Sequence, residues 1–412
     1  MQKVWKRLWN KYRTFKKKET SLIDINSIDS IAKDAIAKKA FPGCEILVAK
    51  DGNIIYEKSF GYYSYNNILP VNNNSIYDLA SLTKIFATTL CVMKLYDEGE
   101  IKLNQKIEDF LPKLKGNKKG KITIKQLLTH TSGLVSFIPF YKSTLSDSGL
   151  NPNLYRDKYS DDYSIEVAPK IFLKTSYKDS LIKRINESPN LNHIYRYSDL
   201  NFIYLAMIIE KISGMSVDKY ASKYFYQPMN LESISFKPLK EFSPSSIVPT
   251  EFDFSFRKQL LKGTVHDPTA TMFGGVAGNA GLFSNAMNLY KLMQMLLNKG
   301  TYLGKKYIEE GTVKLFTSYQ NSSRRGLGFD KPDKNLNKKF PYPAKSASLE
   351  TFGHTGYTGT CAWADPKNNF IFIMLSNKVY PSNTSVFSNL EVRYKMLEAA
   401  LSNKESNNQI LK

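Results

Sequence analysis

The sequence predicts a mixed α/β (α+β) fold in which both ends of the chain build one antiparallel sheet, flanked by helices, around an inserted all-helical region. Strand-like segments occur near both ends of the 412 residues, and helical periodicity dominates from about residue 100 to 250. No internal repeat is visible. Because hairpins from the two ends can pair side by side, we expect an α/β part at about 23–80 and 255–402 around a helical part at about 100–250.

The first element is a hairpin. Residues 44–50 and 53–60 are rich in apolar side chains and flank Asp51-Gly52, a dipeptide that suits the tight turn between antiparallel strands. The segment from Ser81 to about Glu98 then carries apolar residues at helical spacing. The hairpin therefore leads to a buried helix whose first turn contains Ser81.

Helices are predicted through the middle of the chain. Residues 123–128 and 199–212 have helical patterns, and the second of them ends at Gly214, a typical helix stop. A third pattern, over residues 285–297, stops at Gly300. The central part should therefore consist of helices.

A second hairpin and a last helix close the predicted domain. One strand-like run precedes the Asp365-Pro366 turn and a second, over the apolar residues 370–376, follows it, which predicts two paired strands. Residues 388–401 then form an amphipathic helix. We expect one domain over residues 23–402, followed by a polar tail at 403–412.

The chain is basic, with 58 Lys and Arg against 37 Asp and Glu, a formal net charge of +21. Lysine is spread along nearly every segment, so no nucleic-acid partner is expected; only residues 1–22 concentrate charge, among aromatic residues. This basic leader or linker remnant is compatible with peripheral membrane contact. It lacks the apolar run of a signal peptide, and no run suits a spanning helix. We therefore expect a cytoplasmic protein or one at the inner face of the membrane.

Neither the cysteines nor the histidines have the spacing of metal ligands. Three isolated cysteines lie in apolar segments and are expected to be buried thiols: Cys44, Cys91 and Cys361. His130 is expected at a helix end and His193 at the surface. We therefore predict no metal and no cofactor.

The segment Ser81-Leu82-Thr83-Lys84 is the first candidate for catalysis. Residues three apart lie on one face of a helix, so the Lys84 amine can reach the Ser81 hydroxyl and help to remove its proton. Alone this spacing is weak, because a solvated helix face would also explain it. Two other segments give it a context.

Tyr197-Ser198-Asp199 and His354-Thr355-Gly356 follow Ser81 and Lys84 in the order and rough spacing of a known group of enzymes. With these segments the chain resembles the penicillin-recognising serine hydrolases, which include class C β-lactamases, DD-peptidases, D-aminopeptidases and related esterases. The resemblance spans about residues 25–400. Four further segments resemble the family as well: residues 122–134, 274–284, 326–330 and 375–381.

The resemblance implies a β-lactamase/transpeptidase-like fold and a role for each matching residue. Ser81 attacks a carbonyl to form an acyl-enzyme, Lys84 stabilises the alkoxide, and Tyr197 passes the proton to the leaving group. A nearby ammonium favours the phenolate of Tyr197, so the two groups should titrate as one unit. The backbone N–H groups of Ser81 and Tyr357 are the expected oxyanion hole.

The resemblance also implies substrate-binding positions, two of which depart from the usual family pattern. Asp199 stands where β-lactamases usually have Asn, and accepts hydrogen bonds only, unless it is protonated or paired with Lys84. His354 replaces a Lys and can offer a donor and a partial charge near neutral pH. Thr355 and Gly356 follow it, and His266 is expected beside the cleft. Both departures point away from efficient β-lactam hydrolysis.

Several functions remain open from the sequence. The leading hypothesis is a serine hydrolase that cleaves an amide or ester, with a cell-wall-derived or D-amino-acid peptide as substrate. A carboxylesterase is the closest alternative, followed by a class C-type β-lactamase. A binder of penicillin or cell-wall fragments without turnover is the alternative from another class. The acyl group, the oligomeric state and a glycosidase partner are not readable from the chain.

Overall fold

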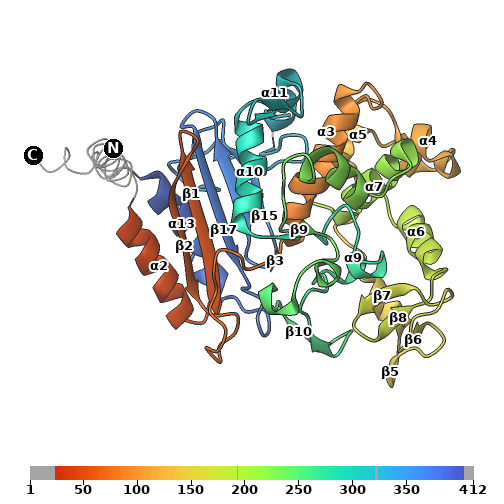
Figure 1. The fold of residues 1–412 in the computed structure, drawn as a ribbon. Coiled ribbons are helices and arrows are strands. Elements are labelled where there is room, and N and C mark those ends of the chain that lie inside the picture. The colour runs from red at the N-terminus through yellow and green to blue at the C-terminus, as the bar shows by residue number, and fades with distance from the viewer. Residues whose placement is uncertain (1–23, 193, 321–322, 403–412) are drawn as a thin grey trace, which may run out of the picture.

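A five-stranded antiparallel sheet lies at one side of the molecule in the computed structural model, which describes residues 24–192, 194–320 and 323–402 (Figure 1). The basic leader, the polar tail and His193 lie outside the described residues. The strand order combines both ends of the chain: β15 (Phe352–Thr355), β16 (Cys361–Asp365), β17 (Phe370–Ser376), β1 (Gly43–Lys50) and β2 (Asn53–Gly61). Both predicted hairpins, β1–β2 and β16–β17, are confirmed, and β1 pairs with β17 so that Leu47 lies opposite Ile373.

Helices cover both faces of this sheet, which explains why its central strands are apolar throughout. On one face lie α2 (Ile25–Ala37), α12 (Val386–Asn389) and α13 (Val392–Leu401), and on the other lies α10 (Ala286–Leu297) (Figure 1). Successive side chains of a strand point to opposite faces. Phe372 of β17 accordingly packs with Trp363 toward α2 and α13, whereas Ile373 packs into the larger core toward α10.

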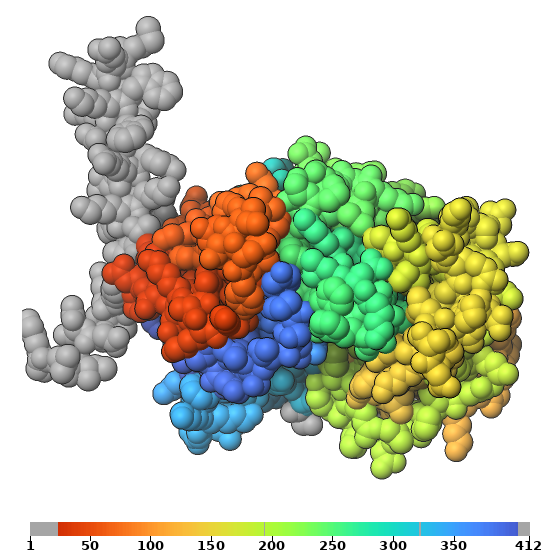
Figure 2. Space-filling view, turned by 90° about the horizontal axis from the view of Figure 1, so that it is seen from below, coloured from red at the N-terminus to blue at the C-terminus, as the bar shows by residue number. Residues whose placement is uncertain are grey.

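The inserted region forms the other half of the molecule, coloured from orange to green, while the first and last described segments, in red and blue, lie side by side (Figure 2). Its helices are α3 (Leu90–Asp97), α4 (Ile107–Phe110), α5 (Ile124–Leu128), α6 (Tyr177–Glu187), α7 (Asp199–Ser213) and α8 (Val217–Ala221). The expectation that this region is all-helical is wrong. It also contains the hairpin β4 (Leu145–Ser146) and β5 (Gly149–Leu150), and a sheet of β6 (Tyr155–Arg156), β8 (Ile171–Leu173) and β7 (Ile165–Ala168).

Short elements join the two halves near Ser81. A small sheet in the order β3 (Tyr77–Asp78), β12 (Phe283–Ser284), β9 (Ile234–Ser235) brings the approach to Ser81 beside the start of α10. The remaining described elements are β10 (Phe252–Asp253), β11 (Gln259–Leu260), α9 (Pro268–Met272), β13 (Thr301–Tyr302), β14 (Lys305–Lys306), α11 (Glu310–Thr317), and the short helices η2 (Ala80–Leu82), η3 (Lys84–Thr89), η4 (Pro112–Leu114), η5 (Lys118–Lys121), η6 (Phe140–Thr144), η7 (Ser222–Tyr226), η8 (Pro238–Lys240) and η9 (Pro244–Ser246).

The predicted helix ends agree with the structure in most places. Thr123 caps α5 through its side chain, and Gly214 ends α7 with a left-handed φ of 68°. Asn285 caps α10. The expected helix over 388–401 is broken at Glu391, whose φ of 52° separates α12 from α13.

Two sequence expectations about composition can be compared with the structure. All three cysteines are free and fully buried, as predicted. Within the described ranges no single helix is long and apolar enough to cross a bilayer; α7 and the helix pair Val217–Tyr226 meet that test only jointly, across a bend of 68°.

Candidate active site

Ser81 lies on η2, a single helical turn at the edge between the two halves. Ala80 before it has a left-handed φ of 47°, a conformation that costs a non-glycine residue energy and is held here by its N–H bond to Asp78 Oδ1 at 2.8 Å. Thr83 Oγ1 donates to Ala80 O at 2.7 Å and accepts from the Leu282 N–H at 3.1 Å. The turn that carries Ser81 is therefore fixed on both sides.

Lys84 lies beneath Ser81 with a side chain that is 0% exposed. Its Nζ donates to Ser81 Oγ at 2.8 Å, to Asp199 Oδ1 at 2.7 Å and to the Asn279 carbonyl at 3.0 Å. An ammonium has three N–H donors. All three are satisfied, so the surroundings suit a charged lysine.

Tyr197 reaches the same oxygen from the start of α7. Its hydroxyl donates to Ser81 Oγ at 3.0 Å. The ring lies against His130, with centroids 4.5 Å apart, and His130 Nδ1 accepts the N–H of Ser198 at 3.1 Å. His130 is thus more than the helix-end residue expected from sequence, because it supports both the ring and the backbone of the Tyr197 segment.

The charges around Ser81 differ in one respect from the sequence expectation. Burial disfavours the ammonium of Lys84, but Asp199 and Tyr197 outweigh it and raise the lysine pKa above its ordinary value. Burial also raises the pKa of Tyr197, and the opposing effect of Lys84 does not overcome it. Lys84 therefore favours the phenolate of Tyr197, as expected from sequence, but the burial of the ring has the larger effect on the pKa.

Asp199 is paired with Lys84, one of the two possibilities that the sequence left open for its carboxyl group. Its carboxylate forms an ion pair with Lys84, and its side chain is 26% exposed. Asp267 lies nearby, is half-buried, and accepts from Ala270 N at 2.7 Å and from Asn279 Nδ2 at 3.3 Å. Burial, followed by the charge of Asp199, raises the pKa of the Asp267 carboxyl. The ion pair with Asp199 thus balances the charge of Lys84.

His354 is buried on β15 and does not supply the partial charge expected from its sequence position. Burial lowers its pKa to about 4, although Asp330 acts in the opposite direction. A neutral imidazole follows, with Nδ1 2.7 Å from the Thr355 carbonyl. The expectation of charge near neutral pH is therefore wrong.

Arg325 carries the positive charge beside His354 and was missed by the sequence reasoning. It is buried, forms an ion pair with Asp330, and donates from Nη2 to Tyr195 Oη at 2.6 Å. Its guanidinium lies 5.3 Å from the centre of the Tyr197 ring. The only signal in the sequence was the pair Arg324-Arg325 directly before the family-like residues 326–330.

The turn after β15 is joined to the backbone that leads to Ser81. Thr358 Oγ1 donates to Asp78 O at 2.7 Å, and Thr360 Oγ1 donates to Leu79 O at 3.1 Å. A Cβ on Gly356 would lie 2.4 Å from Leu79 O, so this approach requires glycine. Within the described residues, the N–H groups of Ser81 and Tyr357 donate to no other group.

These residues line an open cavity of about 380 Å³, which we call the catalytic cavity. Ser81, Tyr197, His354, Thr355, Gly356 and Tyr357 all lie in its wall. Four cationic side chains face it as well, against one acid, Asp330: Arg324, Arg325, Lys378 and Arg393. A larger cavity of about 490 Å³ beside α8 is distant in sequence from these groups and contains none of them.

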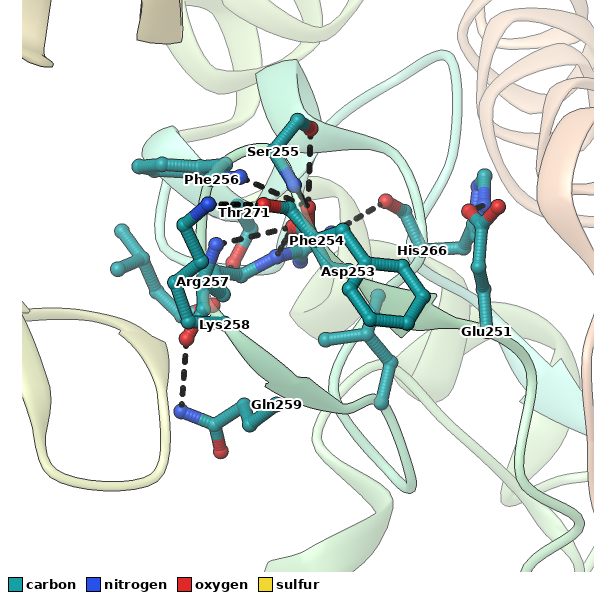
Figure 3. Close-up of polar contacts among 12 residues, drawn as sticks. Glu251, Asp253, Phe254, Ser255, Phe256, Arg257, Lys258, Gln259, His266 and Thr271 are labelled. Atoms are coloured by element: carbon teal, nitrogen blue, oxygen red, sulfur yellow. Dashed lines mark hydrogen bonds and ion pairs between the residues drawn. The ribbon is translucent and has the colours of Figure 1, made fainter. Parts of the chain in front are cut away.

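His266 lies behind Tyr357 rather than in the wall of the catalytic cavity. The two rings stack with centroids 5.4 Å apart, and His266 Nε2 is 2.5 Å from Glu251 Oε2. Arg257, which pairs with Asp253, donates to the His266 carbonyl at 2.7 Å and fixes the loop (Figure 3). Contact between His266 and a substrate stays a prediction.

Within the described ranges, no three or more His, Cys, Asp and Glu side chains lie together in a group that could hold a metal ion.

The Beta-lactamase family model matches residues 28–392. Among curated relatives, a protein of Salmonella enteritidis PT4 named "Putative D-alanyl-D-alanine carboxypeptidase" is 33% identical over 369 residues, which cover 82% of this chain and 79% of the relative. The protein of the same name from Salmonella typhimurium has the same identity and coverage.

Solved structures share the fold at lower identity. EstCE1, a hydrolase with promiscuous acyltransferase activity, aligns with a TM-score of 0.67 at 17% identity, over 92% of this chain and 98% of its own. The octameric penicillin-binding protein homologue from Pyrococcus abyssi aligns with a TM-score of 0.63 at 21% identity, over 90% of this chain and 76% of its own. A class C β-lactamase from Rhodobacter sphaeroides aligns with a TM-score of 0.62 at 15% identity, over 94% of this chain and 100% of its own.

Proposed function

Because this chain belongs to the β-lactamase family of serine hydrolases, we propose that it is a carboxypeptidase for peptides that end in D-amino acids. One observation carries this choice of substrate. The wall around Ser81 presents four cations and one acid. Guanidinium groups bind carboxylates through paired hydrogen bonds, so a substrate with a free carboxylate next to the scissile amide fits this wall. The name of the Salmonella relatives supports the same substrate class.

Acylation begins when Ser81 Oγ attacks the carbonyl carbon of the scissile amide. Its proton moves to the Lys84–Tyr197 pair, whose donor atoms lie 2.8 and 3.0 Å from that oxygen. The carbonyl oxygen becomes an oxyanion, for which the free N–H groups of Ser81 and Tyr357 are the donors. As the C–N bond breaks, Tyr197 gives a proton to the leaving amine, and the acyl group stays on Ser81 as an ester.

Deacylation repeats these transfers with water. Water attacks the ester carbon and gives its proton to the same pair, and Ser81 Oγ leaves with a proton from it. Because the surroundings raise the pKa of both Lys84 and Tyr197, the competent form is the one in which the pair has lost a proton. The rate of acylation should therefore rise with pH.

An ester substrate is the second candidate, and one observation favours it. His354 is neutral and buried where the family usually has a charged Lys, so that position gives no direct charge to a substrate carboxylate. A neutral acyl ester needs no such charge. The cations elsewhere in the wall are the reason that the peptide is preferred.

Kinetics with purified protein test the proposal. The expected result is release of D-alanine from N-acetyl-D-alanyl-D-alanine, with kcat/KM above that for a short-chain ester and for a chromogenic cephalosporin, and no turnover by Ser81→Ala. Ester hydrolysis without peptide hydrolysis would favour the esterase. Stable labelling by penicillin with no turnover of any substrate would favour a binder.

A further inference from the structure

A second cavity, of about 260 Å³, adjoins the catalytic cavity on the side away from the inserted region. We call it the aromatic cavity, because rings form much of its wall: Phe340, Tyr342, Trp363, Phe387 and Tyr394. The two cavities share Tyr342, Thr355 and Arg393 in their walls. A ligand held at Ser81 can therefore extend from one into the other.

Contacts between neighbouring rings hold the wall of the aromatic cavity in place. Trp363 and Phe387 are buried, and Tyr342 meets Trp363 edge to face with centroids 5.3 Å apart. Phe340 meets Tyr394 in the same way at 5.1 Å. Edge-to-face pairs of this kind stabilise ring positions, so an apolar guest meets a rigid surface.

Arg393 stands where the two cavities meet. One of its terminal nitrogens donates to the Gly356 carbonyl, beside the proposed oxyanion donor Tyr357. Its Nε is buried and has no hydrogen-bond partner among the described residues. An unsatisfied buried donor costs free energy, which a bound carboxylate oxygen would recover.

Arg324 faces the same junction with a second unsatisfied donor. Its guanidinium lies 3.6 Å from the centre of the Tyr342 ring, and its Nη1 is buried without a partner in the part of the chain that the structure describes. One unsatisfied guanidinium donor, on Arg393, thus belongs to the wall of the aromatic cavity, and the other, on Arg324, lies against Tyr342 at its edge; the same wall also contains one acid, Glu391. This combination suits a ligand that carries a carboxylate and a large apolar group on neighbouring atoms.

We propose that the aromatic cavity binds the side chain of the C-terminal residue that hydrolysis releases, and that this residue is an aromatic D-amino acid such as D-phenylalanine. Its carboxylate lies against Arg393 and Arg324. The inference rests on the proposed carboxypeptidase function and narrows it, since the methyl group of D-alanine would leave the aromatic cavity empty. The volume is adequate, because an apolar cavity of about 150 Å³ already holds a benzene ring.

The test compares three peptides that share an N-acetyl-D-alanyl acyl group and end in D-alanine, D-phenylalanine or D-phenylalaninamide. The expected kcat/KM is at least about tenfold higher for D-phenylalanine than for D-alanine, as for a well-filled apolar pocket. The amide, which lacks the carboxylate, should lose at least about tenfold relative to D-phenylalanine.

A pair of variants on α12 locates the effect. Ser388 is exposed and lines the aromatic cavity, so Ser388→Trp fills that cavity without opening the core. Asn389 is its exposed neighbour and is not part of the wall, so Asn389→Trp is the matched control. Ser388→Trp should remove the preference for D-phenylalanine, and Asn389→Trp should retain it.

The outcomes separate the inference from the function on which it rests. Ser81-dependent hydrolysis of the D-alanine peptide with no preference for D-phenylalanine would overturn the inference and leave the proposed function in place. A preference that Ser388→Trp does not change would also overturn it. Failure to hydrolyse any of the peptides would overturn both.

Discussion

Replacing Asp199 by Asn should lower the pKa of Lys84 and move the pH dependence of the enzyme toward neutrality. The carboxylate oxygen lies 2.7 Å from Nζ of a lysine that is 0% exposed. At an effective dielectric constant of about 20, this separation corresponds to a gross attraction of about 6 kcal/mol. The 26% exposure of Asp199 and the oxygen that Asn retains reduce the effect. We therefore expect the Lys84 pKa to fall when this carboxylate is replaced.

The assay is the pH dependence of kcat/KM for the peptide that the wild type cleaves best. In the wild type, activity should rise with pH, because the Lys84–Tyr197 pair must lose a proton. In Asp199→Asn that rise should occur at lower pH. Asp218→Asn, near the start of α8 and without contact to Lys84, is the control and should keep the wild-type profile.

Stability provides an independent readout of the same substitution. In the variant, a buried Lys84 has a pKa in the folded state below that of the unfolded chain, so folding is penalised wherever the lysine is charged. The loss should be at most about 3–5 kcal/mol. It should shrink as the pH rises through the lowered pKa. An unchanged pH profile together with unchanged stability would refute the assignment of Asp199 as the partner that keeps Lys84 charged.

Three further predictions concern other parts of the site. Tyr197→Phe should reduce kcat/KM by about 10²–10⁴-fold, because the proton donor to the leaving group is lost, and should leave the melting temperature nearly unchanged, since the ring still contacts His130. The wild type should lose stability relative to His354→Gln as the pH falls from 6.5 to 4, because the folded chain keeps His354 neutral while the unfolded chain takes up a proton. Urea unfolding at several pH values measures this difference. Parallel plots of unfolding free energy against pH for the two proteins would contradict it. Arg325→Gln should lower the free energy of unfolding in urea by about 3–5 kcal/mol, since it leaves Asp330 buried without its cation. The control Lys338→Gln removes an exposed ion pair with Asp333 and should lower it by less than about 1 kcal/mol.

The elements that were predictable from sequence have signals in neighbouring residues. The Asp51-Gly52 turn between apolar runs specifies the β1–β2 hairpin, and Gly214 marks the end of α7. The order of Ser81, Lys84 and Tyr197 along the chain, with the surrounding family-like segments, was enough to expect them together. Their contacts at 2.8 and 3.0 Å agree with that expectation.

The features that were missed depend on burial or on very short segments. The neutral state of His354 follows from its burial, which the sequence does not show, and nothing in the pair Arg324-Arg325 indicates that Arg325 is buried. The sheet of β6, β7 and β8 escaped notice because strands of two to four residues are too short for an alternating pattern. The pairing of Asp199 with Lys84, across 115 positions of sequence, required coordinates.

Mass spectrometry of the protein during turnover tests the central claim most directly. Rapid acid quenching after addition of a slowly released acyl donor, such as a penicillin or a D-alanyl thioester, should trap an adduct. Peptide mapping should place its mass on the fragment that contains Ser81, and Ser81→Ala should show neither adduct nor hydrolysis. Full hydrolysis by Ser81→Ala, or an adduct on a different side chain, would contradict the account.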